Sequence, residues 1–329
     1  MSTITVSEIV SAYGAYYEKA GQNKNRILAM LSQGIELPKH CTKIKTDDTV
    51  YKLSQLTINN LVQAFKKDWS PKGTPAFTPN ELKLYQLKVD LELYPDEIEA
   101  TWLGFLASEN VSRAEWPLIK FLLEHPEQGI LSQIQEDMEM FEYGKGEYEA
   151  PPAGATPGVT GKSMDGVIKQ LQAGVDNETM NSIDIGTLDK DQIFDQVEKF
   201  VDNIDEIYQT KAMNVFMSPY WWKMYRRDKR AQAFYSFSSE AEINNLSESI
   251  DFSPQKVIGV PALSGRNVIF ATPKKNFFHL TKKSIDRSKI KVEEYRRNVS
   301  LLADWWEGIG FGINAIVWTN LQKDTGSPE

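Results

Sequence analysis

One stretch of twenty residues near the middle of the chain allows no regular structure. Between Tyr143 and Lys162 the sequence contains five glycines and three prolines. Proline cannot donate a backbone hydrogen bond, and glycine loses the most conformational freedom when it is ordered, so neither a helix nor a strand is expected to continue through this stretch. The chain is therefore expected to fold as two structured parts that this connector joins.

Composition and charge limit the kinds of protein that the chain can be. Its 329 residues exceed the roughly 250–300 residues of a single core, and its 41% hydrophobic and 25% charged residues are typical of a soluble globular protein. The single cysteine, Cys41, excludes an internal disulfide framework, and the net charge of −8 argues against a dedicated DNA-binding domain. We find neither a signal peptide nor a membrane span, so we expect synthesis in the cytosol and no contact with membranes.

The residues before the connector predict a long hairpin. Apolar and polar residues alternate from Glu81 to Leu93, which indicates a long strand, whereas three prolines and a glycine interrupt residues 66–80. An isolated two-stranded hairpin is marginal in water, so we expect the hairpin of residues 49–94 to find support on a neighbouring chain. The tip residues that we expect to make this contact are Lys66, Lys67, Trp69, Lys72 and Phe77.

Two helices are predicted between the hairpin and the connector. Pro95 is typical of a helix start, and residues 127–143 have the spacing of one continuous amphipathic helix. We expect its acidic residues, Glu136 to Glu142, to face solvent and its apolar stripe to pack on strands near the C-terminus. The stripe consists of Ile130, Ile134, Met138 and Phe141.

The part after the connector begins with helices and ends with strands. Thr187 is the expected N-cap of one helix, and an aromatic and basic helix follows at residues 220–232. We expect Arg226 and Arg227 on that helix to reach other subunits or the inner face of an assembly. Strands are predicted from residue 256 to the end, and the whole order indicates an α+β fold.

The residues that could carry chemistry form only weak patterns. The three histidines lie far apart, and Cys41 merely adjoins His40. Residues 154–163 resemble a phosphate-binding loop, but no apolar strand precedes them. We therefore expect no catalytic, cofactor or metal site; an enzyme that uses this loop or the acidic helix remains a distant alternative.

Four stretches and the order of the predicted elements resemble a known family. The stretches are PDEIEATWLGFL, EDMEMFEYGKGEY, IDEIYQTKAMNVFMSPYWWKMYRRD and GVPALSGRNVIFATPKKN. Together with the hairpin and the long helix they resemble the major capsid proteins of tailed bacteriophages, particularly those of phages infecting Bacteroides-like bacteria. These proteins have the Hong Kong-type capsid fold, which encapsulin shells share.

The resemblance implies a domain organisation. Residues 1–48 would form an N-terminal arm, residues 49–94 an extended loop, and residues 163–262 an axial domain. A peripheral domain would combine residues 95–162, which hold the long "spine" helix, with the strands of residues 263–329. Some family members crosslink a lysine of the extended loop to an asparagine of a neighbour, but this sequence does not identify such a partner.

The resemblance also implies a function and partners. The chain would assemble into hexamers and pentamers of an icosahedral shell around double-stranded DNA, without a cofactor, in the cytoplasm of a host bacterium, and would remain in the virion. Expected partners are further copies of the chain, portal, scaffolding and decoration or head-completion proteins, and packaged DNA in non-specific contact. Any scaffold would be a separate protein. An encapsulin-type compartment is the alternative within this class.

Overall fold

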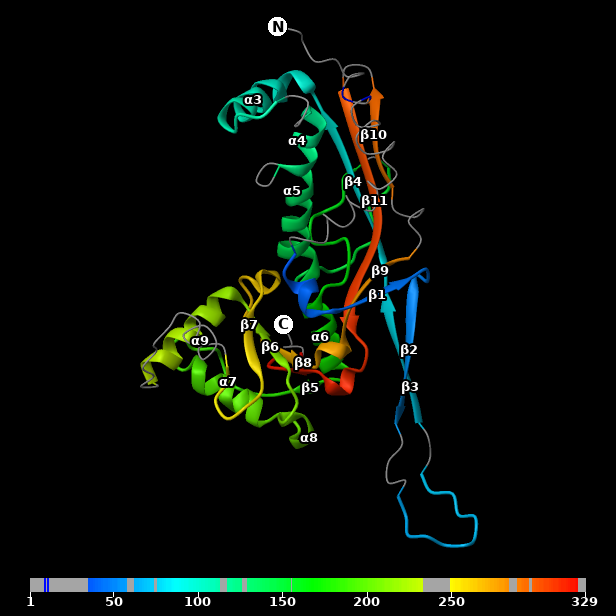
Figure 1. The fold of residues 1–329 in the computed structure, drawn as a ribbon. Coiled ribbons are helices and arrows are strands. Elements are labelled where there is room, and N and C mark those ends of the chain that lie inside the picture. The colour runs from blue at the N-terminus through cyan, green and yellow to red at the C-terminus, as the bar shows by residue number, and fades with distance from the viewer. Residues whose placement is uncertain are drawn as a thin grey trace, which may run out of the picture.

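The computed structural model describes residues 9, 11, 35–57, 62–73, 76–112, 117–125, 129–154, 156–232, 249–283, 289–295 and 298–324. Figure 1 shows two modules and a hairpin that extends away from both of them. The sequence also predicts a short helix at residues 25–31, which lie outside the described residues. The two modules meet where the long helix of the first one ends.

The first module is a sheet of long strands with helices along one side. Its strand order is β1-β9-β11-β10, and β4 also pairs with β11. The strands are β1 (Thr42–Thr46), β4 (Tyr85–Leu93), β9 (Phe277–Lys282), β10 (Lys289–Tyr295) and β11 (Asn298–Phe311). Side chains of β11 alternate between half-buried and buried from Asn298 to Glu307, as expected for a strand with one face on a core.

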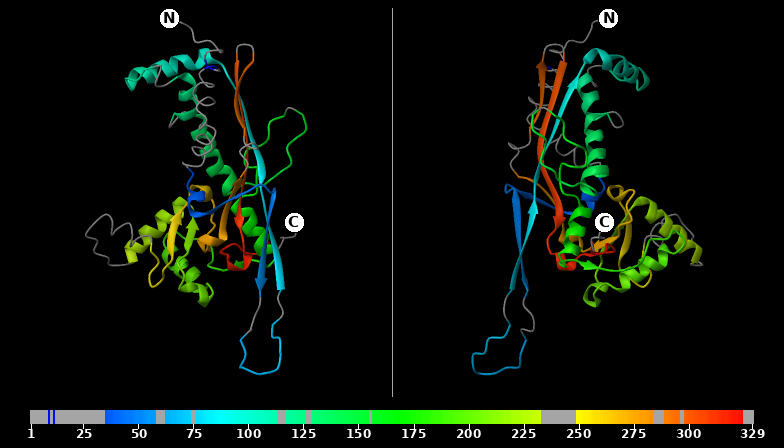
Figure 2. Two further views of the ribbon diagram at one scale, coloured as in Figure 1. Left: turned by 45° about the vertical axis from the view of Figure 1, so that its right-hand side comes forward. Right: turned by 180° about the vertical axis from the view of Figure 1, so that it is seen from behind.

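Three α-helices and a π-helical turn accompany this sheet; in both views of Figure 2 the first of them projects sideways from the end of the sheet, and the others run along it. They are α3 (Pro95–Ser108), α4 (Leu118–Glu124), α5 (Ile130–Asp137) and the π-helical turn η3 (Met138–Tyr143). A further short element, the 3₁₀ helix η2 (Leu37–His40), leads into β1. Trp102 and Leu106 of α3 are buried in the same core as Leu301 and Trp305 of β11, so the helices and the sheet share one hydrophobic interior.

The second module contains a sheet with the order β5-β12-β8-β6-β7 and its own hydrophobic core. The strands are β5 (Asn181–Ser182), β6 (Asn214–Met217), β7 (Lys256–Gly259), β8 (Phe270–Thr272) and β12 (Trp318–Thr319). Its helices are α7 (Ile193–Asp202), α8 (Glu206–Gln209) and α9 (Pro219–Gln232). Helix α6 (Val167–Asp176) leads into this module but buries Val167 and Leu171 in the core of the first. The 3₁₀ helices η4 (Pro261–Leu263), η5 (Lys274–Asn276) and η7 (Asn314–Ile316) lie in the connections.

The last part of the chain contributes to both modules. The sequence grouped residues 263–329 with the spine helix, but β8 pairs with β6, and β12 pairs with β8 and β5. Ile269, Ala271 and Trp318 accordingly belong to the core of the second module. Short strands of two or three residues carry too little pattern to reveal which sheet they join.

The hairpin is shorter than the sequence predicted. Strands β2 (Val50–Thr57) and β3 (Ala76–Lys83) pair antiparallel, from Val50 with Lys83 to Thr57 with Ala76. The prediction of a single strand from Glu81 to Leu93 is wrong, because Leu84 interrupts it and β4 pairs with β11 instead. The pattern does mark the interruption: apolar side chains stand at even positions in Leu82 and Leu84 and at odd positions from Tyr85 to Leu93, so the alternation shifts by one residue after the buried Leu84.

The spine helix, residues 130–143, is continuous but changes type. Its last part is π-helical, and the wider turn places an extra residue between successive positions on one face. Ile134 and Met138 are buried and Ile130 is half-buried, but Phe141 is 44% exposed and Tyr143 is fully buried. The assignment of Phe141 to the buried stripe is therefore wrong, since the stripe ends on Tyr143.

Helix α7 begins later than predicted. Its first residue is Ile193, and Thr187 lies in the preceding loop, where its carbonyl accepts a hydrogen bond from the Gln196 side chain at 2.7 Å. An amide of the first turn that has no partner within the helix is satisfied by α9 instead, because the buried Phe194 N–H donates to the carboxylate of Asp228 at 2.9 Å. Asp228, 34 positions further along the chain, thus caps the first turn of α7 in place of a local N-cap residue.

Candidate assembly surfaces

The tip of the hairpin carries large apolar side chains in full contact with solvent. Val62, Phe65 and Trp69 are 91%, 93% and 92% exposed. Lysines 66, 67 and 72 are exposed among them, whereas the side chain of Phe77 lies outside those that the structure describes. Burying a side chain such as Phe is worth about 1.5–3 kcal/mol, so exposed apolar groups on a projecting element are typical of an interaction site.

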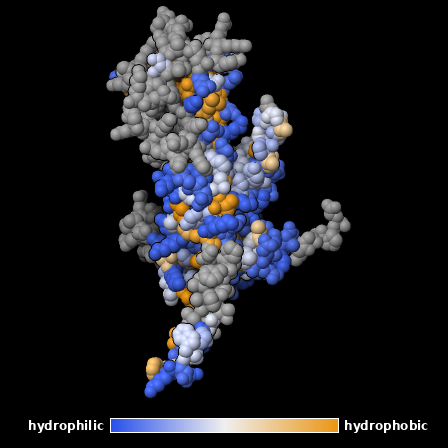
Figure 3. All heavy atoms as spheres, turned by 90° about the vertical axis from the view of Figure 1, so that its right-hand side faces the viewer, coloured by the Kyte–Doolittle hydropathy of each residue, from blue (hydrophilic) through white to orange (hydrophobic). Residues whose placement is uncertain are grey.

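Two hydrogen bonds close the tip on itself. The Gln63 side chain donates to the Ser70 carbonyl at 2.7 Å, and the Lys72 ammonium donates to the Val62 carbonyl at 3.0 Å. Lys72 is thus partly used within the tip, and the apolar side chains remain outside it. Figure 3 shows the hairpin as a narrow projection at the bottom of the molecule, with apolar surface at its end.

The base of the hairpin is fixed firmly to the first module. The Asn80 side-chain amide donates to the carbonyls of Phe311 and Gly312 at 2.7 and 3.1 Å. A Cβ on Gly308 would lie 2.2 Å from the Lys83 carbonyl oxygen, so glycine allows β11 to approach the end of β3. A Cβ on Gly310 or Gly312 would instead meet side chains, so among these three glycines the close approach to backbone is made by Gly308.

Glu139, on the spine helix, joins three distant segments. Its carboxylate accepts hydrogen bonds from the backbone N–H groups of Glu36 at 3.1 Å, Leu37 at 3.3 Å and Ala262 at 3.3 Å. The residue is only 6% exposed, and burial raises the pKa of Glu139 although these hydrogen bonds oppose the shift. The expectation that Glu139 faces solvent is therefore wrong.

Glu142, one turn later, holds the glycine-rich connector. Its carboxylate accepts hydrogen bonds from the N–H groups of Gly161 at 2.8 Å, Ser163 at 3.1 Å and Met164 at 3.3 Å. Residues 154–163 were the stretch that resembles a phosphate-binding loop. Amides of this loop do surround an anion, but that anion is the buried carboxylate of Glu142. The expectation that Glu142 faces solvent is therefore wrong as well.

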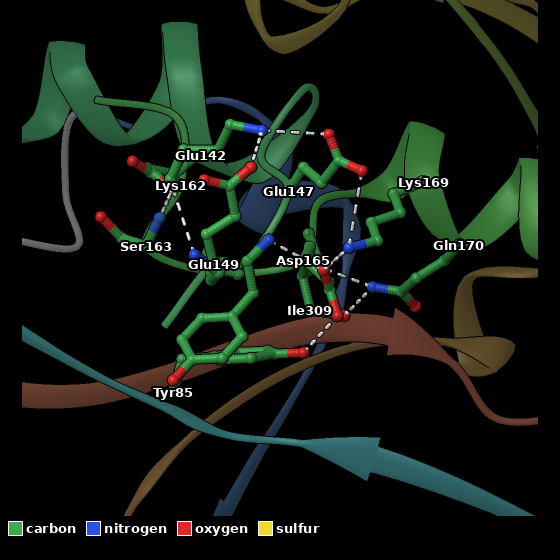
Figure 4. Close-up of polar contacts among 12 residues, drawn as sticks. Tyr85, Glu142, Glu147, Glu149, Lys162, Ser163, Asp165, Lys169, Gln170 and Ile309 are labelled. Carbon is green, nitrogen blue, oxygen red and sulfur yellow. Dashed lines mark hydrogen bonds and ion pairs between the residues drawn. The ribbon is translucent and has the colours of Figure 1, made fainter. Parts of the chain in front are cut away.

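Ion pairs fasten the rest of the connector, as Figure 4 shows. Lys162 pairs with Glu147 at 3.2 Å and with Glu149 at 2.7 Å. The Asp165 carboxylate accepts hydrogen bonds from the Tyr85 hydroxyl of β4 and the Tyr148 N–H, and it pairs with Lys169 at 2.8 Å. The pKa of Asp165 is lowered because its hydrogen bonds to these groups outweigh the effect of burial.

A buried polar cluster links the end of the spine helix to the sheet. Glu307 of β11 accepts hydrogen bonds from the Tyr143 hydroxyl at 3.0 Å and from the Trp305 indole at 3.2 Å, and its other oxygen lies 3.1 Å from Nε2 of His279. Burial, followed by the charge of Glu307, raises the pKa of Tyr143. These contacts bind η3 to β9 and β11, so the cluster has a structural role.

The two arginines singled out on α9 differ in their surroundings. Arg227 is exposed, whereas Arg226 is half-buried with its guanidinium 4.6 Å from the centre of the Trp222 ring. Lys229 on the same helix is buried and pairs with Asp251 at 2.7 Å. Periodicity alone does not distinguish a cation that packs on the module from one that faces outward.

The groups considered for catalysis lie apart or are already engaged. The Cys41 thiol donates to the Leu37 carbonyl at 3.5 Å, and burial raises the pKa of the thiol, which disfavours the reactive thiolate. The adjacent His40 lies near Glu36 instead. Within the described ranges, no three His, Cys, Asp or Glu side chains gather as a metal site would need, and no helix has the length and apolarity to cross a membrane.

Comparisons with known proteins identify the fold. No family model and no curated protein matches the sequence. A chain from the procapsid of satellite phage P4, in a structure that includes the size determination protein Sid, superposes with a TM-score of 0.58 at 11% identity, over 90% of this chain and 89% of the other. The chain has the Hong Kong-type capsid fold.

Weaker similarities involve other shells. The capsid of the myovirus phage XM1 matches with a TM-score of 0.47 at 10% identity over 85% of this chain and 88% of the other. The virus-like particle of Pyrococcus furiosus matches with a TM-score of 0.46 at 10% identity over 92% of this chain and 99% of the other. The sequence predicted an α+β capsid fold, and the match to the P4 procapsid chain confirms this fold class.

Proposed function

We propose that the chain is the major capsid protein of a tailed phage. The observation that carries this proposal is the combination of a capsid fold over 90% of the chain with a projecting hairpin whose tip exposes Phe65 and Trp69. Within the part of the chain that the structure describes, no element covers these side chains. A shell of identical subunits supplies the missing surface, and it requires no active site.

In this proposal each part of the chain has a place in the shell. Residues 1–48 are the arm, the hairpin is the extended loop, and the first module is the peripheral domain. The second module is the axial domain, whose contacts form rings of six and five subunits. The tip residues and Arg227 lie in contacts between subunits, and the shell encloses double-stranded DNA.

The remaining partners follow from the same proposal. A closed head needs a portal, and scaffolding and decoration or head-completion proteins complete it. Subunits assemble in the cytoplasm of a host bacterium and end in the virion, where contact with packaged DNA is non-specific. From the resemblance of the four sequence stretches we also infer that the host is related to Bacteroides.

The test is assembly of the full chain. The purified wild type is expected to sediment as large closed particles that are visible by negative-stain microscopy. The double variant Phe65→Ser/Trp69→Ser should keep the circular dichroism of the wild type, because both side chains are outside the core, and should lose most particles. A matched control, Phe65→Leu/Trp69→Phe, keeps apolar side chains at the tip and should assemble.

Two results would contradict the proposal. A wild-type chain that stays monomeric at every concentration and ionic strength tested is incompatible with a shell subunit. If the wild type assembles and the serine variant assembles equally well, the hairpin tip is not a contact between subunits, although the chain remains a shell protein.

A further inference from the structure

Two helices of the second module each display a stripe of like charges. The "acidic stripe" on α7 consists of Asp195, Glu198 and Asp202, and the "basic stripe" on α9 consists of Lys223, Arg227 and Arg230. In each stripe the residues are three or four positions apart, so they lie on one face of their helix. Both helices belong to the same hydrophobic core, and Figure 1 shows them at the edge of the module farthest from the hairpin.

The basic stripe points away from its own module. Tyr225, Asp228 and Lys229 form the buried face of α9, and Tyr225 contacts Phe194 of α7. At 100° per residue, Lys223, Arg227 and Arg230 lie on the opposite face, and all three are exposed. In the described part of the chain no carboxylate forms an ion pair with any of them.

The acidic stripe concentrates negative charge. Asp195 and Asp202 are exposed and Glu198 between them is half-buried. The pKa of Glu198 is raised by burial first and then by the carboxylates of Asp251, Asp195 and Asp202. Lys229 opposes this shift, but it is already paired with Asp251. Lys199 is also exposed on α7, one turn after Asp195, but three carboxylates outweigh its single charge, so the stripe remains negative.

The spacings of the two stripes are complementary. Along α7 the charged positions are separated by three and then four residues, and along α9 by four and then three. Two helices that run antiparallel would therefore bring Asp195 to Arg230, Glu198 to Arg227 and Asp202 to Lys223. Opposite charges at this spacing attract along the whole contact.

Two exposed apolar side chains lie near one end of this register. Tyr220, one turn before Lys223, is 53% exposed, and Ile207, shortly after Asp202, is 73% exposed. In the antiparallel register both are at the end where Asp202 meets Lys223. Burial of apolar surface there would add to the attraction between the charges.

We propose that the acidic stripe of one subunit binds the basic stripe of the next subunit within a ring. The proposal rests on the shell function proposed above and names the residues of one of its contacts. Because the two stripes are different surfaces, the contact is head-to-tail and continues from subunit to subunit until the ring closes. A nucleic acid bound to the basic stripe would leave the acidic stripe unpaired, so a second copy of the chain fits both stripes better.

The experiment reverses one stripe at a time in the full chain. Variant one carries Asp195→Lys, Glu198→Lys and Asp202→Lys; variant two carries Lys223→Glu, Arg227→Glu and Arg230→Glu. Each is expected to keep the circular dichroism of the wild type and to yield at least ten-fold fewer particles, since like charges then meet at every contact. A variant that carries all six substitutions has both stripes reversed; it restores opposite charges at the contact and should recover assembly.

A mixture of the two single-stripe variants gives a sharper result. In variant one both stripes are basic, and in variant two both are acidic, so favourable contacts form only between unlike subunits. A six-membered ring can alternate the two, but a five-membered ring must place two like subunits side by side. The mixture is expected to form six-membered rings, open sheets or tubes without closed shells.

The outcomes separate this proposal from the wider one. If the wild type does not assemble, the shell function itself fails. If the wild type assembles and either single-stripe variant assembles as well as it does, the stripes are not a contact between subunits, and this proposal is overturned. The proposal is overturned also if variant two forms normal shells that merely retain less DNA.

A second pair of variants applies if a triple variant does not fold. Glu198→Gln and Arg227→Gln are then compared with the wild type by the protein concentration at which particles first form. Unchanged concentrations would overturn the proposal too.

Discussion

The Glu139 carboxylate of the spine helix accepts a hydrogen bond from the backbone N–H of Ala262 at 3.3 Å, across 123 residues of sequence. Ala262 follows β7, the edge strand of the second module, so this contact joins the two modules. The same carboxylate holds the segment before β1 through Glu36 and Leu37. One buried side chain thus fixes the position of three parts of the molecule.

Replacing Glu139 with Gln should destabilise the subunit. The amide keeps one oxygen acceptor in place of two and turns an NH2 group toward N–H donors, so at least one donor loses its partner and the free energy of unfolding should fall by about 1–3 kcal/mol. Chemical denaturation of the dissociated subunit measures this change. The control Glu136→Gln alters an exposed carboxylate on the same helix and should change stability by less than about 0.5 kcal/mol. Equal effects of the two substitutions would refute the structural role.

The difference between wild type and Glu139→Gln should depend on pH. Burial raises the pKa of Glu139 above 4.5, so the folded state holds this proton more tightly than the unfolded state does. The resulting stability is fully present below pH 4.5 and is lost as the pH rises through the raised pKa. The advantage of wild type over the variant should therefore be larger below pH 4.5 than at pH 7. Unfolding curves of both proteins across this range measure it, and an advantage that grows with pH would contradict the prediction.

Gly308 and Gly310 should respond differently to substitution by alanine. A Cβ on Gly308 would meet the Lys83 carbonyl oxygen of the backbone at 2.2 Å, so β3 or β11 must move. A Cβ on Gly310 would meet the side-chain ends of Gln170 and Leu82 at 2.6 and 2.7 Å, which can rotate away. Gly308→Ala should cost about 1–3 kcal/mol and Gly310→Ala clearly less. Denaturation midpoints in the reverse order would show that the base of the hairpin is not packed as described.

Charge on the two faces of the spine helix should have opposite consequences. Ile134→Asp places a carboxylate in the core of the first module, so soluble folded protein should largely disappear. Phe141→Asp changes a side chain that is 44% exposed and should leave a folded subunit. Soluble yield and circular dichroism test both. If Phe141→Asp were as damaging as Ile134→Asp, the π-helical end of the helix would be wrong.

Asn80→Ala should loosen the hairpin without unfolding the module. The variant loses the donor to the carbonyls of Phe311 and Gly312, at a cost of about 1 kcal/mol. Backbone amides of β2 and β3 should then exchange with solvent faster, while those of β9 keep their protection. Hydrogen exchange with mass spectrometry measures both. Gln86→Ala, at an exposed position of β4, is the control and should change neither.

Apolar periodicity predicted most elements correctly, because burial of one face is what the pattern records. Helix α3 and helix α9 are found where the spacing of their residues placed them, whereas the hairpin exists but ends at Lys83. The same reasoning failed for Glu139 and Glu142, since a carboxylate that will accept backbone hydrogen bonds looks in the sequence like one that faces water. The sequence did hold a signal of this role. Two acids three positions apart stand directly before a glycine-rich connector that has many free backbone amides.

Other differences depend on contacts that are far apart in sequence. The π-helical turn that exposes Phe141 leaves no mark in an amphipathic pattern of so few residues. The capping of α7 by Asp228 requires knowledge that α9 packs beside it. The acidic and basic stripes were visible as charged residues, but their matched spacing acquired a meaning only once the buried faces of both helices were known.

The attachment of the hairpin at one end also makes it a lever. Each of its strands has eight residues, so the paired ribbon is about 27 Å long at about 3.4 Å per residue. A tilt of about 10° at the base would carry the far end through roughly 5 Å over that length. Small rotations about Asn80 are thus amplified into large displacements of Trp69. Subunits inclined differently to their neighbours, as in rings of five and of six, could keep the same tip contact with only a slight adjustment where the ribbon meets the sheet.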